Sequence, residues 1–255
     1  MNLFDLSGKI SIVTGAGRGI GRHIALGYAR AGSHVVLCSR TRAELDALAG
    51  EIRACGVQAL AVACDVTRHE DVAGLVRETL ERFGRIDVLV NNAGMTIKKP
   101  AVEYLPEDWE RVIALNLSGV FYVAQAVGRQ MIRQRGGRII NISSVAGRTA
   151  LTGSVAYCAS KGGVDMITRV LAAEWAEHGV LVTGLAPAYT ETPLVKELTE
   201  RMPDFAERVR ARTPLGRLAH PEEMVGTAIY LASEASTYVT GETICVDGGW
   251  TAFGF

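Results

Sequence analysis

Short apolar runs of strand length alternate with longer amphipathic stretches along this chain. Seven runs predict strands, which cover Lys9–Thr14, Ser33–Ser39, Gln58–Cys64, Ile86–Asn91, Arg138–Ile142, Val180–Leu185 and Glu242–Val246. The intervening patterns predict helices over Ile20–Ala31, Arg42–Ala54, His69–Phe83, Glu107–Arg135, Val155–His178 and Pro221–Ser233. Strands that are apolar on both faces and are followed by helices are typical of a parallel sheet covered on both sides. The pattern therefore predicts a doubly wound α/β fold.

No long polar linker interrupts the alternation, so residues 1–255 are predicted to form a single domain. One polar, partly helical insertion precedes the last helix, at residues 190–214, and its length suits a segment that moves over a substrate. The first eight residues are not expected to act as a signal peptide, because Asp5 and Gly8 interrupt any apolar stretch.

Charge and cysteine usage narrow the possible partners. The chain has 27 basic and 27 acidic residues, so nothing points to a nucleic-acid or membrane partner. Its five cysteines are irregularly spaced and form no CxxC pair. This usage favours reduced thiols in a cytoplasmic protein over a disulfide framework or a metal site.

A glycine-rich segment follows the first predicted strand and opens the next helix, with the sequence TGAGRGIG over residues 14–21. Glycines let a backbone turn tightly and approach a pyrophosphate, while the helix N-terminus offers N–H groups and a positive dipole end. The spacing is T-G-x-x-x-G-x-G and not G-x-G-x-x-G, because Ile20 and Arg22 occupy the positions of the last glycine. A glycine-rich turn without a ligand is the alternative, but its place between strand and helix favours a phosphate loop.

The end of the second predicted strand decides which nicotinamide cofactor fits. NAD sites usually carry Asp or Glu there, bonded to the adenosine 2′-hydroxyl, whereas this strand ends in Cys38-Ser39-Arg40. Arg40 can bind a 2′-phosphate through a forked, charge-assisted contact, and Arg18 can approach it from the glycine loop. The sequence predicts NADP(H) over NAD(H); the alternative is that Arg40 and Arg42 only begin a solvated helix.

Tyr157 and Lys161 lie four residues apart in the sequence YCASK, near the start of a long predicted helix. This spacing puts both side chains on one face, one turn apart. A phenol has an ordinary pKa of about 10, and a neighbouring ammonium is expected to lower it. The pair is a candidate proton donor and acceptor for a carbonyl/alcohol couple. The alternative is a tyrosine that only stacks on a lysine stem.

Other polar residues are predicted at the same edge of the sheet. Ser144 lies 13 residues before Tyr157, just past the fifth strand, where ligands bind in open α/β sheets. It is expected to orient the reacting oxygen. The sequence NNAG, residues 91–94, ends the fourth strand at this edge. Asn116 is a lone amide in an apolar helical stretch, so it is either structural or holds a water that passes protons to Lys161.

Together, TGAGRGIG, NNAG, Asn116, Ser144 and YCASK resemble the short-chain dehydrogenase/reductase family over essentially the whole chain. The resemblance implies a Rossmann-like seven-stranded parallel sheet, an oxidoreductase for carbonyls and secondary alcohols, and a homotetramer. It implies a catalytic tetrad of Asn116, Ser144, Tyr157 and Lys161, with Lys161 also holding the nicotinamide ribose. It implies cofactor contacts at Gly15, Arg18, Gly19, Ile20, Ser39, Arg40, Asp65, Val66, Asn91, Ala93, Gly94, Tyr157, Lys161, Pro187 and Thr192.

The chain departs from the family after the sixth strand, where Thr183 and Ala188 replace the usual Asn and Gly. Pro187 and Thr192 still match the family pattern, so Thr192 is expected to contact the cofactor carboxamide. The departure concerns the conformation of this loop and not the chemistry of the site.

Substrate residues are expected in the insertion and in the stretch after NNAG. The segments LFDLSGK, AAEWAEHG and RTPLGR make the chain similar to gluconate 5-dehydrogenase-like members of the family. We expect a keto-sugar, sugar acid or polyol, with a carboxylate paired to Lys98, its neighbour Lys99 or Arg148, beside Ser144 and Tyr189. Alternatively, the lysine pair is solvated surface charge. Trp250 and Phe255 either wall the pocket or pack an interface.

Three further functions compete with a sugar oxidoreductase. A 3-oxoacyl-thioester reductase would need a basic outer patch for an acidic carrier, which a net charge of zero does not support. A nucleotide-sensing regulator with a dead site, or a purely structural protein, is disfavoured because all four catalytic residues are present.

Overall fold

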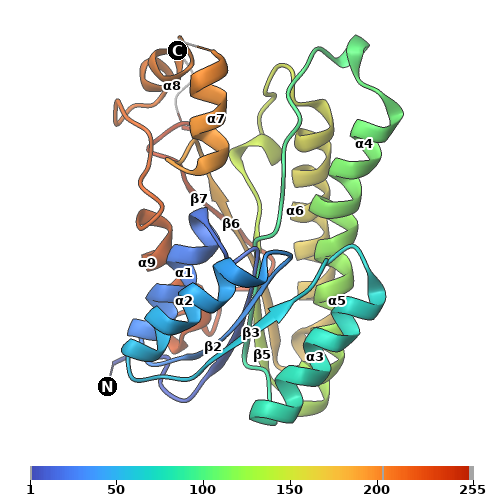
Figure 1. The fold of residues 1–255 in the computed structure, drawn as a ribbon, viewed down its shortest axis with the longest axis vertical. Helices are drawn as coiled ribbons and strands as arrows, with labels where there is room; N and C mark the ends of the chain where they lie inside the picture. The colour runs from blue at the N-terminus through green and yellow to red at the C-terminus, as the bar shows by residue number, and fades with distance from the viewer. Residues whose placement is uncertain (1, 203, 253–255) are drawn as a thin grey trace.

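Seven parallel strands form one sheet in the computed structural model, which describes residues 2–202 and 204–252 (Figure 1). The strand order is β3-β2-β1-β4-β5-β6-β7. The strands span Ile10–Thr14 (β1), His34–Ser39 (β2), Ala59–Ala63 (β3), Val88–Asn91 (β4), Gly137–Ile142 (β5), Val180–Pro187 (β6) and Thr243–Val246 (β7). The predicted doubly wound, Rossmann-like sheet is confirmed. Its order reverses between β1 and β4, and such a switch point is where these sheets bind ligands.

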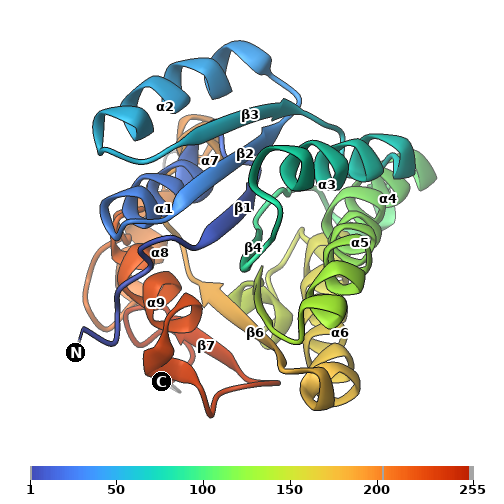
Figure 2. The same cartoon turned by 90° about the horizontal axis from the view of Figure 1, so that it is seen from below.

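Helices cover both faces of the sheet (Figure 2). One face carries α1 (Gly19–Arg30), α2 (Arg42–Ala54) and α9 (Glu223–Ala232), and the other carries α3 (His69–Phe83), α5 (Gly119–Gln134) and α6 (Val155–Trp175). Strand side chains alternate between the two cores: Val35 and Leu37 join the first, and Val36 joins the second. Consecutive side chains of a strand point to opposite faces of the sheet, and both faces are buried. For this reason each strand appears in the sequence as a continuous hydrophobic run.

The predicted helix over Glu107–Arg135 contains a change of helical type. Helix α4 (Pro106–Ile113) passes through a π-helical turn, Ala114–Ser118, before α5 begins. There the Gly119 N–H bonds the Ala114 carbonyl five residues back. By length and hydropathy the whole helix Pro106–Gln134 could cross a membrane, but 44% of its most apolar window is buried in the fold.

Short 3-10 turns complete the helical elements. They are η1 (Ala101–Glu103), η3 (Val145–Gly147), η4 (Ala176–His178) and η5 (Glu234–Ser236). The predicted helix over Val155–His178 ends in one of them, η4, because Gly179 follows in the left-handed conformation, at φ 75°.

The insertion at residues 190–214 folds into α7 (Pro193–Arg201) and α8 (Phe205–Arg212). Figure 1 shows both helices at the end of the molecule that carries the C-terminus. They have a small core of their own, which combines Val195, Phe205 and Val209 with Val145, Leu218 and Trp250 from outside the insertion. The insertion is thus packed as a unit over one end of the sheet.

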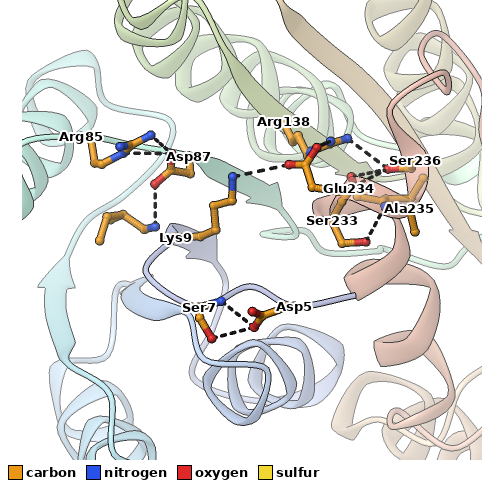
Figure 3. A network of polar contacts seen from close by, with 12 residues as sticks. Asp5, Ser7, Lys9, Arg85, Asp87, Arg138, Ser233, Glu234, Ala235 and Ser236 are labelled. Atoms are coloured by element: carbon orange, nitrogen blue, oxygen red, sulfur yellow. Dashed lines mark hydrogen bonds and ion pairs between the residues drawn. The ribbon is translucent and has the colours of Figure 1, made fainter. Parts of the chain in front are cut away.

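Charged residues close the opposite, amino-terminal edge of the sheet (Figure 3). The buried carboxylate of Asp87 accepts a hydrogen bond from the Ile10 N–H at 2.9 Å and contacts Arg85 at 2.6 Å. Arg138 donates to Ser236 and pairs with Glu234, which also contacts Lys9. These contacts join β4 to β1, and they join β1 and β5 to the C-terminal region, which is far from both strands in sequence.

Candidate active site

A cleft of about 460 Å³ lies at the carboxyl ends of the strands. Most residues predicted to contact cofactor or substrate line it: Gly15, Arg18, Gly19, Ile20, Ser39, Arg40, Asp65, Val66, Ala93, Gly94, Lys98, Ser144, Tyr157, Lys161, Pro187, Tyr189 and Thr192. Four predicted residues do not line it: Asn91, Lys99, Asn116 and Arg148.

The glycine loop is tightly packed against the end of β4. Gly15 has φ 63°, and a Cβ there would lie 2.8 Å from the Asn92 amide nitrogen and 2.9 Å from the Ala93 Cα. Asn92 donates from its side chain to the carbonyls of Thr14 and Gly15, at 2.9 and 3.1 Å. Thr14 in turn accepts from the N–H groups of Asn92 and Ala93. These bonds hold a loop in which only glycine fits.

Sequence analysis missed Asn92 and chose its neighbour Asn91 as a cofactor contact. The Asn91 amide is buried and donates to the Val120 carbonyl and to Asn141, at 3.3 and 3.0 Å, so it ties β4 to α5 and β5. Side-chain alternation along a strand gives the reason: consecutive residues point to opposite faces.

The first turn of α1 suits an anion. Arg18 precedes the helix, the first turn contains no acidic residue, and the N-terminus opens on the cleft. Arg18 and Arg40 are exposed at the cleft, and neither forms a salt bridge within the described residues. Glu44 also lines the cleft, where its carboxylate occupies the space that a Cβ at Gly17 would need. The site thus offers two cationic side chains for a phosphate, with one acid nearby.

Asp65 stands at the end of β3, beside Val66. Its carboxylate accepts from the Thr67 N–H and hydroxyl, at 3.0 and 2.7 Å. Burial works to raise the pKa of Asp65, but the Thr67 bonds and the nearby Arg40 and Arg68 hold it below its usual range. Asp65 is therefore a fixed anionic acceptor at the cleft.

Ser144, Tyr157 and Lys161 meet in the cleft. Ser144 begins η3 and accepts from the Ala146 N–H at 3.2 Å, which fixes its hydroxyl beside that of Tyr157. Tyr157 and Lys161 share one face of α6, and the Lys161 amine lies 5.7 Å from the centre of the Tyr157 ring. The amine is buried and donates to the Ile142 carbonyl at 2.7 Å, at the end of β5.

The electrostatics of this trio differ from the expectation. Burial raises the pKa of Tyr157, and the hydrogen bond to Ser144 only partly opposes this. Burial also lowers the pKa of Lys161 to about 8, against an opposing effect of Asp165. The expected lowering of the tyrosine pKa is therefore wrong for this arrangement, because desolvation of the phenolate outweighs the hydrogen bond from Ser144. The phenol is protonated at neutral pH.

Asn116 sits in the π-helical turn and is fully buried. Its amide oxygen accepts from the Met95 N–H at 2.9 Å, and its nitrogen donates to the Met95 carbonyl and the Ser160 hydroxyl, at 2.8 and 3.2 Å. The side chain joins the loop after β4 to α6 beside Lys161. Of the two interpretations left open, this geometry supports the structural one for the side chain.

The predicted substrate residues separate into two groups. Lys98 and Tyr189 line the cleft, where the Lys98 amine lies 5.1 Å from the centre of the Phe205 ring. Tyr189 packs edge-on against Phe205 and Trp250, with ring centres 5.1 and 5.3 Å apart. Trp250 thus supports the cleft wall from behind, while Phe255 lies outside the described residues.

The lysine next to Lys98 and the arginine near Ser144 are engaged elsewhere. Lys99 pairs with Asp108. The Arg148 guanidinium donates to the Thr243 carbonyl at 2.7 Å and contacts Asp165 and Glu242. The prediction of Arg148 as a substrate residue is therefore corrected. Its guanidinium reaches β7 behind the cleft, because the turn η3 points the side chain away from Ser144.

The two departures from the family pattern, Thr183 within β6 and Ala188 directly after it, do not displace the loop from the cleft. Thr183 is buried and donates to the Ile139 carbonyl at 3.5 Å, and Ala188 lines the cleft beside Pro187. Thr192 accepts from the Val195 N–H and so begins α7, with its methyl 3.5 Å from where a Cβ at Gly19 would sit. The insertion thus begins directly against the glycine loop.

Comparisons with known proteins agree with this geometry. A family model described as enoyl-(acyl carrier protein) reductase matches residues 15–251. Gluconate 5-dehydrogenase of Gluconobacter oxydans is 41% identical, covering 98% of this chain and 97% of that protein. The chain belongs to the short-chain dehydrogenase/reductase family. As a member of that family, it is an oxidoreductase that acts on CH–OH groups and the corresponding carbonyls.

Two further comparisons give similar agreement. The 3-oxoacyl-[acyl-carrier-protein] reductase of a Synechocystis strain is 42% identical, covering 97% of this chain and 99% of that protein. A crystal structure of a gluconate 5-dehydrogenase from Burkholderia cenocepacia, in complex with NADP and tartrate, matches with a TM-score of 0.95 and 42% identity, covering 99% of both chains.

Proposed function

We propose that this short-chain dehydrogenase/reductase interconverts a keto-sugar or sugar acid ketone and its secondary alcohol with NADP(H), using Tyr157 as the acid–base residue. The observation that carries the proposal is the convergence of Ser144, Tyr157 and Lys161 in one cleft with the glycine loop. Two arginines that form no salt bridge within the part of the chain described by the structure line the same cleft. Gluconate 5-dehydrogenases among the relatives support the substrate class.

NADP(H) fits the residues that line the cleft. The glycine loop and the start of α1 would hold the pyrophosphate, and Arg18 and Arg40 the 2′-phosphate. Asp65 and Val66 would flank the adenine, while Lys161 would hold the nicotinamide ribose and Thr192 the carboxamide. When bound, the dinucleotide supplies or accepts the hydride of the reaction.

The chain's own residues would handle the proton. In the reducing direction the protonated Tyr157 hydroxyl donates its proton to the carbonyl oxygen, and in the oxidising direction the phenolate takes it back. Ser144 donates to the same oxygen and orients it. The Lys161 ammonium stabilises the phenolate left after donation, since an opposite charge nearby favours the charged form. Asn116 would hold the loop and helix that frame these groups.

Lys98 and Tyr189 would recognise the far end of the substrate. Lys98 lines the cleft and forms no salt bridge within the described residues, so its ammonium is available to a carboxylate. Burial lowers the pKa of Lys98, and the nearby positive charge of Arg208 lowers it further. A sugar acid would neutralise that charge, whereas a neutral polyol would not.

A 3-oxoacyl-thioester reductase is the second candidate, favoured by the 42% identity to a cyanobacterial enzyme of that name. We further propose a cytoplasmic homotetramer without nucleic-acid or membrane partners. Exposed apolar side chains along α5 and α6, among them Phe121, Met166 and Val170, support assembly through these two helices. Sedimentation velocity would test the assembly.

Substrate and cofactor choice can be tested together. NADPH oxidation would be measured against keto-sugar acids, neutral keto-sugars, diketones and acetoacetyl thioesters, and repeated with NADH. The proposal expects the highest kcat/KM with a keto acid and NADPH. Lys98→Met should raise KM for the acid selectively, with Lys196→Met as a surface control. Preference for NADH would refute the cofactor assignment, and preference for a thioester would favour the second candidate.

The role of Tyr157 has its own test. Tyr157→Phe removes the hydroxyl and keeps the ring, so NADPH should still bind while turnover falls by about 10²–10⁴-fold. Fluorescence titration of NADPH measures the first and steady-state kinetics the second. Retention of wild-type turnover would refute the mechanism.

A further inference from the structure

A buried carboxylate lies one helical turn beyond Lys161, outside the residues that line the cleft. Asp165 is 7% exposed, and its Oδ1 accepts from the Thr243 hydroxyl at 3.1 Å. Its Oδ2 lies 3.8 Å from the Arg148 Nε. The turn is tightly packed, because a Cβ at Gly147 would meet the same Oδ2 at 2.8 Å and the Lys161 carbonyl at 3.0 Å.

A buried carboxylate is costly unless it has charged or hydrogen-bonding partners. Arg148 only partly supplies them: its guanidinium is about one-third exposed and is shared with Glu242. On α6, Asp165 follows Lys161 by four residues, which puts the two side chains on one face of the helix, one turn apart. The negative charge of Asp165 raises the pKa of the Lys161 amine, against the effect of burial.

The other groups around the amine carry no negative charge. From α6 itself comes the phenol of Tyr157, from β5 the Ile142 carbonyl, and from η3 the cation Arg148, which contacts Asp165. From the π-helical turn comes the neutral Asn116, bonded to Ser160. Among residues 2–202 and 204–252, Asp165 is the one carboxylate that acts on Lys161.

We propose that Asp165 is a positioning residue of the reaction, which keeps the Lys161 amine in its ammonium form on the buried floor of the cleft. The proposal rests on the proposed function, because the ammonium matters only if it stabilises the Tyr157 phenolate. Thr243 and Arg148 hold the Asp165 carboxylate in place. Gly147 leaves space for the carboxylate itself, and Gly184 leaves space for the Thr243 hydroxyl, which would lie 2.3 Å from a Cβ at that position.

Asp165→Asn removes the charge and keeps the shape. In cofactor-free protein, the pH dependence of Lys161 acetylation by acetic anhydride, followed by peptide mass spectrometry, reports the amine directly. In the native chain we expect its midpoint to follow the Lys161 pKa of about 8. In Asp165→Asn the midpoint should fall by roughly one pH unit. The control Glu242→Gln removes an exposed carboxylate that also contacts Arg148, and it should leave the midpoint unchanged. An unmoved midpoint in Asp165→Asn, or an equal shift in Glu242→Gln, overturns the proposal.

Kinetics provide the second measurement. With NADPH and the preferred ketone, the alkaline limb of the kcat profile should move to lower pH in Asp165→Asn, while KM for NADPH at pH 6.5 stays within about twofold. A uniform loss of kcat at every pH would indicate a structural role and overturn the proposal. If wild-type protein reduces no carbonyl, the proposed function fails, but the acetylation result still tests the charge on Lys161 separately.

A second variant covers the case in which Asp165→Asn does not fold. Arg148→Gln removes the cation that shares Asp165, so the full carboxylate charge acts on Lys161. The acetylation midpoint should then rise, opposite to the Asp165→Asn shift. A midpoint that falls or stays fixed would overturn the proposal.

Discussion

Replacing Lys161 by methionine should stabilise the fold at neutral pH while removing its chemistry. Burial lowers the pKa of this lysine from its ordinary 10.5 to about 8. Each pKa unit corresponds to about 1.4 kcal/mol, so holding the charged amine in the folded state costs about 3 kcal/mol at pH 7. The lost hydrogen bond to the Ile142 carbonyl offsets about 1 kcal/mol of this. The variant should therefore be about 2 kcal/mol more stable.

The pH dependence separates this effect from a packing gain. Because the folded pKa lies below the unfolded one, the unfolded chain binds more protons between about pH 8 and 10.5. The wild-type protein therefore gains stability relative to Lys161→Met as the pH rises through that window. Below pH 8 the cost is fully present.

Urea denaturation of the cofactor-free protein at pH 7, 8.5 and 10 measures the difference, with Lys196→Met, on the exposed side of α7, as the control. The Lys161→Met advantage should shrink steadily with pH, and the control difference should stay constant. A variant that is no more stable at pH 7, or an advantage independent of pH, would refute the reasoning.

Two further predictions concern packing and the sheet edge. Gly21→Ala would place a Cβ 2.3 Å from the Asn92 amide nitrogen and 2.5 Å from the Gly15 carbonyl, so it should cost about 1–3 kcal/mol and weaken NADPH binding. At Gly50, on helix α2, a Cβ would meet nothing within 4 Å, so Gly50→Ala should instead stabilise the fold by about 0.5–1 kcal/mol. Urea titration measures the stability of both variants and fluorescence titration their NADPH binding. Equal effects of the two substitutions would contradict the packing argument. Asp87→Ala leaves the Ile10 N–H without its acceptor and should cost about 1–3 kcal/mol. Glu234→Ala removes a half-exposed carboxylate and its ion pairs, so it should cost under about 1 kcal/mol. Thermal melts of the two variants compare their stability. A larger loss in Glu234→Ala than in Asp87→Ala would argue against a buried role for Asp87.

Strand and helix positions followed from the sequence because each strand is apolar on both faces and each helix has one apolar stripe. The cleft followed from parallel topology, which brings Ser144 and the glycine loop to one edge although 123 residues separate Ser144 from Gly21. The π-helical turn at Asn116 did not follow, because its residues have ordinary helix patterning and only tertiary packing selects it.

The directions of individual side chains also could not be predicted from the sequence. Arg148 follows Ser144 by four residues, but the 3-10 turn between them points the guanidinium at β7, and no sequence pattern indicated this. The sign of the Tyr157 shift was also missed, since desolvation depends on the surroundings of the phenol, which the YCASK sequence does not contain.

The separate core of the insertion has a consequence for how substrates enter. Helices α7 and α8 share their apolar contacts with Trp250 and Val145 and not with the two cores that flank the sheet. Such a cluster tends to loosen as one cooperative unit, ahead of global unfolding. Amide hydrogens of α7, α8 and the Trp250 turn should accordingly exchange in a single block, and access to the ketone site would be governed by that block's opening rate.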